Sequence, residues 1–212
     1  MSKPDQVGRS RIHQWSVGIL LTTFIAAAAG SALHPAAALV IQTIDQMQTQ
    51  MRAERGTLEQ DKSRVDQLVE EIALPHFDFE NISASVLGKY WRTATDEQRQ
   101  RFREAFKSLL LSTYAKALVD NMDKKIEFEP VRAAPNATDV KVRSSIPQDS
   151  EFPLPMNYSM ELIDNQWKVY DVEIDGLSLV KNYRTSFAKE IKQSSLENLI
   201  KILSDRKKDV SS

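Results

Sequence analysis

The stretch WKVYDVEIDGLSLVKNYRTSF, residues 167–187, decides the fold class because the spacing of its apolar residues changes along it. Trp167 and Val169 alternate with polar residues, which is typical of a strand with one buried face. Beyond Tyr170 the apolar residues occupy the other parity, so a β-bulge or sharp coil near Tyr170 is needed to reconcile the two registers. Because a bulged strand bends, we expect a strongly curved sheet.

Alternation with period two also runs through three segments upstream of this stretch. The dipeptide Asp164-Asn165 predicts a hairpin turn between the last two strands. One-sided alternation of this kind indicates antiparallel pairing, and we therefore predict about four antiparallel strands. The apolar positions of the three upstream segments are Ile126 and Phe128; Val140 and Val142; and Met156, Tyr158, Met160 and Leu162.

Helical spacing dominates both sides of this strand region. Thr95 and Gln98 have the spacing of a capping box, which predicts the start of a long helix. Ser194 and Glu197 have the same spacing before the last helix. The order of helices, strands and helices predicts an α+β fold, cone-like, with the curved sheet packed against several helices. Apolar stripes predict these helices over about 40–51, 65–72 (ended by Pro75), 81–90, 96–118, 179–191 and 195–203.

The first forty residues read as an export signal. Lys3, Arg9 and Arg11 precede an apolar run over about 17–29, and small residues follow it. This run is shorter than the roughly twenty residues that span a bilayer, so we expect a cleaved signal peptide over 1–38 rather than a membrane anchor. Cleavage after Ala38 fits the Ala36-x-Ala38 spacing and is the first choice, and cleavage after Ala32 is the second. The rest of the chain, 39–212, is expected to form one domain. Export through such a signal predicts a periplasmic protein.

Composition excludes several classes of function. The chain has no cysteine, which excludes disulfides and a lipoprotein anchor and favours a bacterial periplasm over a eukaryotic extracellular space. Without the signal the chain has three more acidic than basic residues, which is no nucleic-acid footprint, so we expect no nucleic-acid partner.

Catalytic and cofactor motifs are also missing from the sequence. His76 is the single histidine after residue 38, so a Cys–His pair is impossible and a zinc site lacks ligands. No G-x-S-x-G motif and no glycine-rich phosphate loop is present. We therefore expect no enzyme, no metal and no cofactor. If the protein were an enzyme, Asp171 and Asp175 would be the best available acid–base pair. The same spacing is also typical of carboxylates on a strand face that is exposed to solvent.

Long, soft and aromatic side chains are frequent on the faces expected to be buried. A curved sheet facing an apolar helix encloses either a filled core or an apolar cavity, and methionines suit a site that accepts varied shapes. Three functions remain open on these residues: a carrier with an enclosed cavity, an enzyme on a related cone-shaped α+β scaffold that uses Asp171 and Asp175, and a periplasmic interaction or chaperone module that exposes its apolar surface.

A resemblance to a known family favours the carrier. The pattern Y-D-V-x-I-D-G-x-S-L-V-x-N-Y-R within 167–187 resembles the MlaC family, also called the toluene-tolerance auxiliary family. Supporting segments are LPHFDFENIS (74–83), LGKYWRTATDEQRQRFREAFKSLL (87–110) and the following TYAKAL. The resemblance implies a soluble periplasmic carrier that holds a phospholipid, its cargo, by the acyl chains. It also implies transport between an outer-membrane lipoprotein–porin complex and an inner-membrane ABC transporter with an MCE-domain subunit, which maintains outer-membrane lipid asymmetry.

The candidate wall of the cavity follows from the facing pattern of the expected strands and helices. Tyr183 and Arg184 match the family's N-Y-R, and a headgroup contact and a structural role both stay open for Arg184. The candidate lipid-binding residues are Val86, Phe102, Phe106, Leu110, Phe128, Val142, Met156, Tyr158, Met160, Trp167, Val169, Val172 and Ile174.

Overall fold

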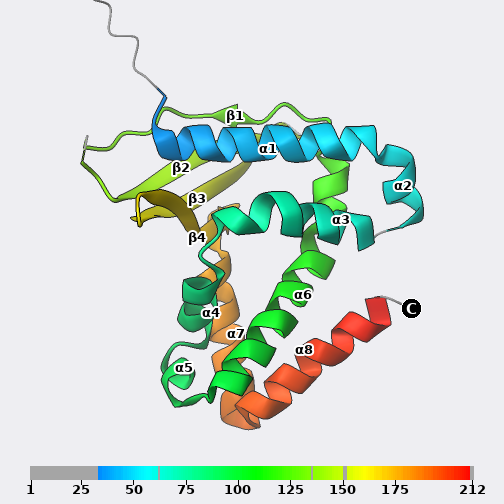
Figure 1. Ribbon diagram of the computed structural model, residues 1–212, viewed down its shortest axis with the longest axis vertical. Helices are drawn as coiled ribbons and strands as arrows, with labels where there is room; N and C mark the ends of the chain where they lie inside the picture. Colours follow the sequence, from blue (N-terminus) through cyan, green and yellow to red (C-terminus); the bar gives the residue numbers. More distant parts are fainter. Residues whose placement is uncertain (1–32, 62, 135, 150–151, 211–212) are drawn as a thin grey trace, which may run out of the picture. The chain divides into compact units, whose positions relative to one another are not determined.

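The computed structural model describes residues 33–61, 63–134, 136–149 and 152–210, and its central element is an antiparallel sheet (Figure 1). Residues 1–32 of the expected signal peptide lie outside this described part. None of the described helices is long and apolar enough to cross a membrane. The sheet has five strands in the order β1 (Glu127–Phe128), β2 (Asp139–Ile146), β3 (Leu154–Ile163), β4 (Gln166–Ile174) and β5 (Leu177–Ser178).

The register of β3 and β4 confirms the bulge that the parity change predicts. Ser159 pairs with Asp171 whereas Met160 pairs with Val169, so Tyr170 is the extra residue. The hairpin turn is also confirmed, because Asp164 and Asn165 both have positive φ, 47° and 62°, as a two-residue turn between twisted strands requires. The strand beyond the expected four is the two-residue β5.

One face of the sheet is apolar across the central strands. Cross-strand neighbours share a face, and Val142, Tyr158 and Val172 form one such row. The first half of α1 (Pro35–Ala53) packs on part of this face, with Ala36 and Ala37 fully buried against the β2 side. The small side chains of these alanines allow the helix to approach the strands closely.

The chain after α1 runs through short and irregular helices. Pro75 has no N–H to donate, and its ring clashes with the carbonyl of the residue four positions earlier, so a regular α-helix cannot continue through it. The turn before Pro75 is a π-helix, in which the Leu74 N–H donates to the Val69 carbonyl. The expected helix over 65–72 is therefore only partly α-helical. The elements are α2 (Arg55–Gln60), α3 (Ser63–Leu68), the π-helix η1 (Val69–Ala73) and the 3₁₀ helix η2 (Leu74–His76).

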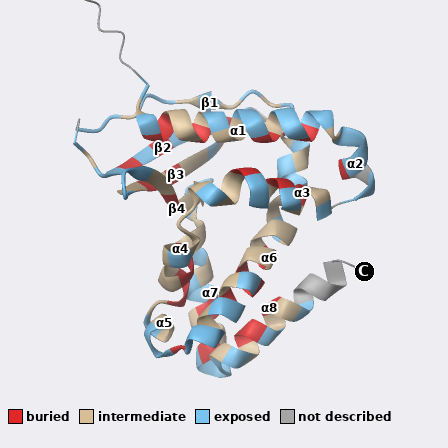
Figure 2. Cartoon of the chain, in the orientation of Figure 1, coloured by how far each residue is buried: buried red, intermediate tan, exposed pale blue. Residues whose placement is uncertain are grey.

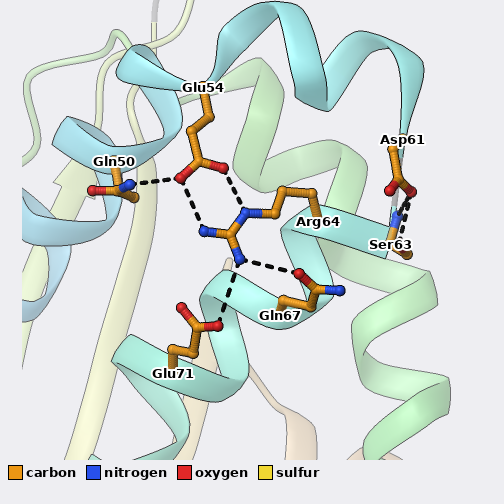
Figure 3. A network of polar contacts seen from close by, with 7 residues as sticks. All are labelled: Gln50, Glu54, Asp61, Ser63, Arg64, Gln67 and Glu71. Atoms are coloured by element: carbon orange, nitrogen blue, oxygen red, sulfur yellow. Dashed lines mark hydrogen bonds and ion pairs between the residues drawn. The ribbon is translucent and has the colours of Figure 1, made fainter.

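A network around Arg64 holds the α1–α2–α3 junction together (Figure 3). The Arg64 guanidinium donates from Nε and Nη2 to the two carboxylate oxygens of Glu54, at 2.5 and 2.9 Å. Hydrogen bonds from Arg64 and from Gln50 lower the pKa of Glu54 to about 2. The network fixes how α3 folds back beside the end of α1, which places η1 at the edge of the cavity described below.

The remaining helices form a second layer below the sheet in the view of Figure 1. The capping box at α6 is confirmed, because Thr95 accepts from the Gln98 N–H and Gln98 accepts from the Thr95 N–H. The cap of α8 lies one residue beyond the expected Ser194, since the Ser195 hydroxyl accepts from the Asn198 N–H. The helices are α4 (Phe79–Leu87), α5 (Lys89–Thr93), α6 (Asp96–Asp120), α7 (Leu179–Gln193) and α8 (Leu196–Val210).

Aromatic rings dominate the core of this helical layer, whose buried faces are red in Figure 2. Phe106 lies at the centre, with ring centroids 5.5 Å from Phe102, 5.9 Å from Phe79, 5.2 Å from Tyr183 and 5.6 Å from Phe187. This cluster joins α4, α6 and α7. Residues of the second half of α6, among them Leu110, Leu111 and Leu118, border a cavity instead.

Candidate functional site

An apolar cavity of about 420 Å³ lies between the sheet, α1, η1 and the second half of α6. Its wall comes from elements far apart in sequence, and the backbone of α6 stands away from the strands. The lining is almost entirely aliphatic, aromatic or methionine, which suits hydrocarbon rather than a polar ligand. Residues of the wall include Val40, Ile44, Met47, Met51, Val69, Leu74, Phe77, Leu111, Leu118, Ile146, Leu154, Leu179 and Val180.

Polar side chains on the wall are few and are engaged with the protein. Lys107 forms ion pairs with Glu70 at 3.0 Å and Glu104 at 3.2 Å. Burial, and then the nearby Tyr183 on α7, raise the pKa of Tyr114 on α6 to about 12. Lys107 joins α6 to η1 at the edge of the cavity through its ion pair with Glu70, so it is not a free partner for a charged ligand.

Asp171 has a structural use that argues against the acid–base pair. Its carboxylate accepts from the Ser178 hydroxyl at 2.5 Å and from the Val180 N–H at 3.1 Å, which fastens the start of α7 to β4. Asp175 lies four residues further along the chain, in the turn after β4. Four strand residues span about 13 Å, which is too far for two carboxylates to share one substrate bond.

His76 also borders the cavity, and its surroundings favour the neutral form of its imidazole ring. Burial, and then the nearby charge of Lys168, lower the pKa of His76. The Lys168 Nζ itself donates to the Pro75 carbonyl at 2.7 Å. Within the described part of the chain no group of three metal-ligating side chains is found.

The structure brings eight of the thirteen candidate lipid-binding residues to the cavity wall. They lie on α6 and on one face of the central strands β3 and β4. Binding of lipid by these residues stays a prediction. The eight are Phe106, Leu110, Met156, Tyr158, Met160, Val169, Val172 and Ile174.

The other five candidates lie in packed core beside the cavity instead of on its wall. Val86 and Phe102 belong to the helical core. Val142 lies on the same sheet face as the wall, but it is completely buried among residues of the α1–sheet cluster, to which Phe128 and Trp167 also belong. Facing pattern alone does not separate these positions from the wall, because it does not reveal which part of a face a helix covers.

Sequence reasoning missed the contributions of α1 and η1 to the wall, and on the second half of α6 it identified only Leu110. The stripe of Val40, Ile44, Met47 and Met51 is recognisable as a helix face, and all four residues border the cavity. On α6, the run of three leucines that ends at Leu111 could have indicated a second apolar surface. Three consecutive residues of a helix point in different directions, so they cannot all pack into the same core, and Leu110 and Leu111 border the cavity.

The N-Y-R residues do not line the cavity. Tyr183 packs in the aromatic cluster against Phe106 and Phe187. Arg184 lies over the junction of α4 and α5, where a Cβ at Gly88 would sit 3.1 Å from its Nε and Nη2 atoms. Gly88 has φ of +57°, and this conformation together with the close guanidinium favours glycine there. The position of Arg184 supports a structural role for it.

Comparison with known proteins decides the family. The family model described as MlaC protein matches residues 41–205 of the chain. The chain belongs to the MlaC family. Among curated relatives, an intermembrane phospholipid transport system binding protein MlaC from Haemophilus influenzae is 24% identical over 85% of this chain and 86% of its own length. The toluene tolerance protein ttg2D of Pseudomonas putida is 34% identical over 54% of this chain and 53% of its own length.

A solved structure of similar fold holds a ligand. The phospholipid-binding protein of Ralstonia solanacearum, determined in complex with a phospholipid, is 34% identical to this chain, with a TM-score of 0.77. The match covers 84% of this chain and 99% of that protein. The α+β architecture with an open antiparallel sheet is therefore shared with a phospholipid-binding protein.

Proposed function

We propose that this protein is a periplasmic carrier that encloses the acyl chains of a phospholipid in the cavity between the sheet and α6. The observation that carries the proposal is the apolar cavity on a chain similar to a phospholipid-bound protein. The headgroup remains in water, because the described polar groups of the wall are engaged with the protein. We therefore expect selectivity for acyl chains over headgroups.

Energetics favour an enclosed cavity over a surface groove for such cargo. Two acyl chains have roughly thirty methylenes, and each costs about 0.8 kcal/mol to expose to water. The total of about 24 kcal/mol is an upper figure for a lipid crossing water unprotected. Because the apolar lining is turned inward, a carrier is favoured over a chaperone that displays its apolar surface, and the use of Asp171 as a fastening group supports a role without catalysis.

Transport between two membrane complexes completes the proposal. We infer that the loaded protein exchanges phospholipid with an outer-membrane lipoprotein–porin complex and with an inner-membrane ABC transporter bearing an MCE-domain subunit. The names of two relatives, which refer to intermembrane phospholipid transport and to toluene tolerance, support this assignment. A freely diffusing carrier also requires removal of the N-terminal apolar run.

Native mass spectrometry tests the carrier directly. The purified exported protein is expected to carry an added mass equal to that of phospholipid, and denaturation followed by lipid extraction should release it. Purification of the same protein after delipidation supplies the unliganded reference. A protein that is purified without lipid, and that takes up none from added phospholipid, contradicts the proposal.

We further propose cleavage of the signal after Ala32 in preference to Ala38. Cleavage after Ala38 would remove the first turn of α1, including Ala36 and Ala37, which are completely buried against the sheet. It would also remove His34, whose ring lies 5.3 Å from that of Trp167. The intact mass of the exported protein is expected to correspond to a first residue Leu33, and a mass that begins at Leu39 would contradict this.

A further inference from the structure

The basic residues of α7 differ from those of α6 because they have no acidic partners. All five arginines and lysines of α6 form ion pairs, among them Arg101 with Glu197 at 2.5 Å and Lys107 with Glu70 at 3.0 Å. The four basic residues of α7 are all exposed, and none of them forms an ion pair with a carboxylate in the described part of the chain. They are Lys181, Arg184, Lys189 and Lys192.

These four cations lie on one side of α7, which we call the basic face. Arg184 lies three residues after Lys181, and Lys192 lies eleven residues after Lys181, which is close to three whole turns. Lys189, three residues before Lys192, lies beside them. Like charges at such spacings repel one another, and Lys181 in the first turn also opposes the helix dipole. The basic face therefore does not stabilise the helix, and an acidic partner would relieve the repulsion.

Carboxylates on α7 itself and on β4, to which the start of α7 is fastened, have other partners. Glu190, the acidic residue of α7, accepts hydrogen bonds from Ser194 at 3.1 Å and from Asn198 at 3.3 Å, at the turn between α7 and α8. Glu173 on β4 forms its ion pair with Lys141 at 3.2 Å. The other carboxylate of β4 holds the start of α7, as described above. The basic face is therefore left for an acidic group from outside.

The side chains of α7 favour a protein surface over a bilayer as the source of those acidic groups. A helix that lies on lipid turns an apolar side toward it. The large apolar side chains of α7, among them Phe187 and Ile191, face the helical core or the cavity instead. Between the cations lie only the small residues Thr185 and Ala188. Charges held on a rigid helix are complemented by opposite charges at fixed positions on a folded partner, which guide its encounter and orientation.

We propose that the basic face docks on an acidic surface of a membrane-complex protein with which the carrier exchanges phospholipid. The inference rests on the proposed carrier function and adds the docking surface and the charge of its partner. Leu179 and Val180, the first two residues of α7, line the cavity, and Lys181 follows them directly. A partner on the basic face therefore contacts an element that forms part of the cavity wall.

Binding measurements with purified complexes test this surface. Immobilised protein is exposed to the inner-membrane ABC transporter complex with its MCE-domain subunit and, separately, to the outer-membrane lipoprotein–porin complex, both from the same organism. Wild-type affinity for at least one complex is expected to fall about tenfold between low and high salt. Lys181→Glu/Lys192→Glu is expected to weaken that binding at least about tenfold, and Lys181→Gln/Lys192→Gln to weaken it less.

Lys125→Glu/Arg132→Glu is the matched control. Lys125 and Arg132 are exposed, flank β1 in the other layer of the fold, and give the same change of net charge when replaced by glutamate. This control is expected to bind like wild type. Circular dichroism and native mass spectrometry show that each variant is folded and retains its lipid, which is expected because every substituted residue is exposed.

Several results would overturn the inference. These are wild-type protein that binds neither complex, a Lys181→Glu/Lys192→Glu variant that binds as tightly as wild type, and equal weakening by the control. Binding to phosphatidylglycerol vesicles that this variant alone loses, with unchanged binding to both complexes, would replace the protein partner by an anionic bilayer. A wild-type protein that never loads phospholipid would overturn the proposed function itself, whereas a lipid-loaded variant with unchanged docking overturns only the role of the basic face.

Discussion

Replacing Val172 with tryptophan is expected to leave the protein folded but to reduce its phospholipid occupancy to less than about a tenth of the wild-type value. Val172 lies on β4, is half-buried and points into the cavity from the row that it shares with Tyr158. An indole placed there occupies space that an acyl chain would fill. Because the cavity is empty of protein atoms on that side, the overpacking cost of about 1–3 kcal/mol found in filled cores is an upper figure here.

Arg143→Trp is the matched control for this experiment. Arg143 is exposed on β2 and alternates with the buried residues Val142 and Ser144, so its side chain lies on the face away from the cavity. Both variants gain the same indole on the same sheet. Lipid is measured by native mass spectrometry and folding by circular dichroism; full lipid occupancy in a folded Val172→Trp protein would contradict the assignment of the cavity.

The shape of the sheet was predictable because the signals for it are local. The change of apolar parity around Tyr170 is visible in the sequence, and the bulge is the local solution to it. The same holds for the capping box of Thr95 and Gln98, in which the two residues satisfy each other's backbone donors within one turn. Each of these features depends on residues within a few positions of one another.

The extent of the cavity was only partly predictable because it depends on contacts between distant segments. Val142 and Val172 lie in one cross-strand row on the same face of the sheet, on either side of Tyr158, yet only Val172 of the two lines the cavity. The difference arises from the place at which α1 crosses the strands. That place depends on the close packing of Ala36 and Ala37 of α1 against the sheet and on the fold of the chain that follows α1. No spacing within a strand contains that information.

The irregular helix before η2 illustrates the same limit. Pro75 marks the end of a helix in sequence, and its effect reaches back one turn, where the bond from Leu74 to Val69 widens the helix into a π-turn. Val69 and Leu74 then both border the cavity. The stripe predicted a buried face, but whether that face meets core or cavity is decided by α6, about forty residues away.

Truncating Phe106 to alanine is expected to lower the free energy of unfolding by about 3–5 kcal/mol. Phe106 is 1% exposed and has four aromatic neighbours within 6 Å between ring centroids, from α4, α6 and α7. Loss of the ring removes its buried area, and each lost aromatic pair adds about 0.5–1.5 kcal/mol beyond that area. The surrounding rings sit on three different helices, so they cannot collapse into the space without moving the helices.

Urea unfolding of delipidated protein, followed by circular dichroism, measures this loss without the stabilisation that bound lipid would contribute. Leu177→Ala is the control, because Leu177 is 68% exposed and its truncation should change the free energy of unfolding by less than about 0.5 kcal/mol. The two effects differ for one physical reason, the number of packed neighbours that each side chain holds. A Phe106→Ala protein as stable as Leu177→Ala would mean that the aromatic cluster does not hold α4, α6 and α7 together. Because Phe106 also lines the cavity, that result would mean as well that this part of the cavity wall is not held rigidly by the cluster.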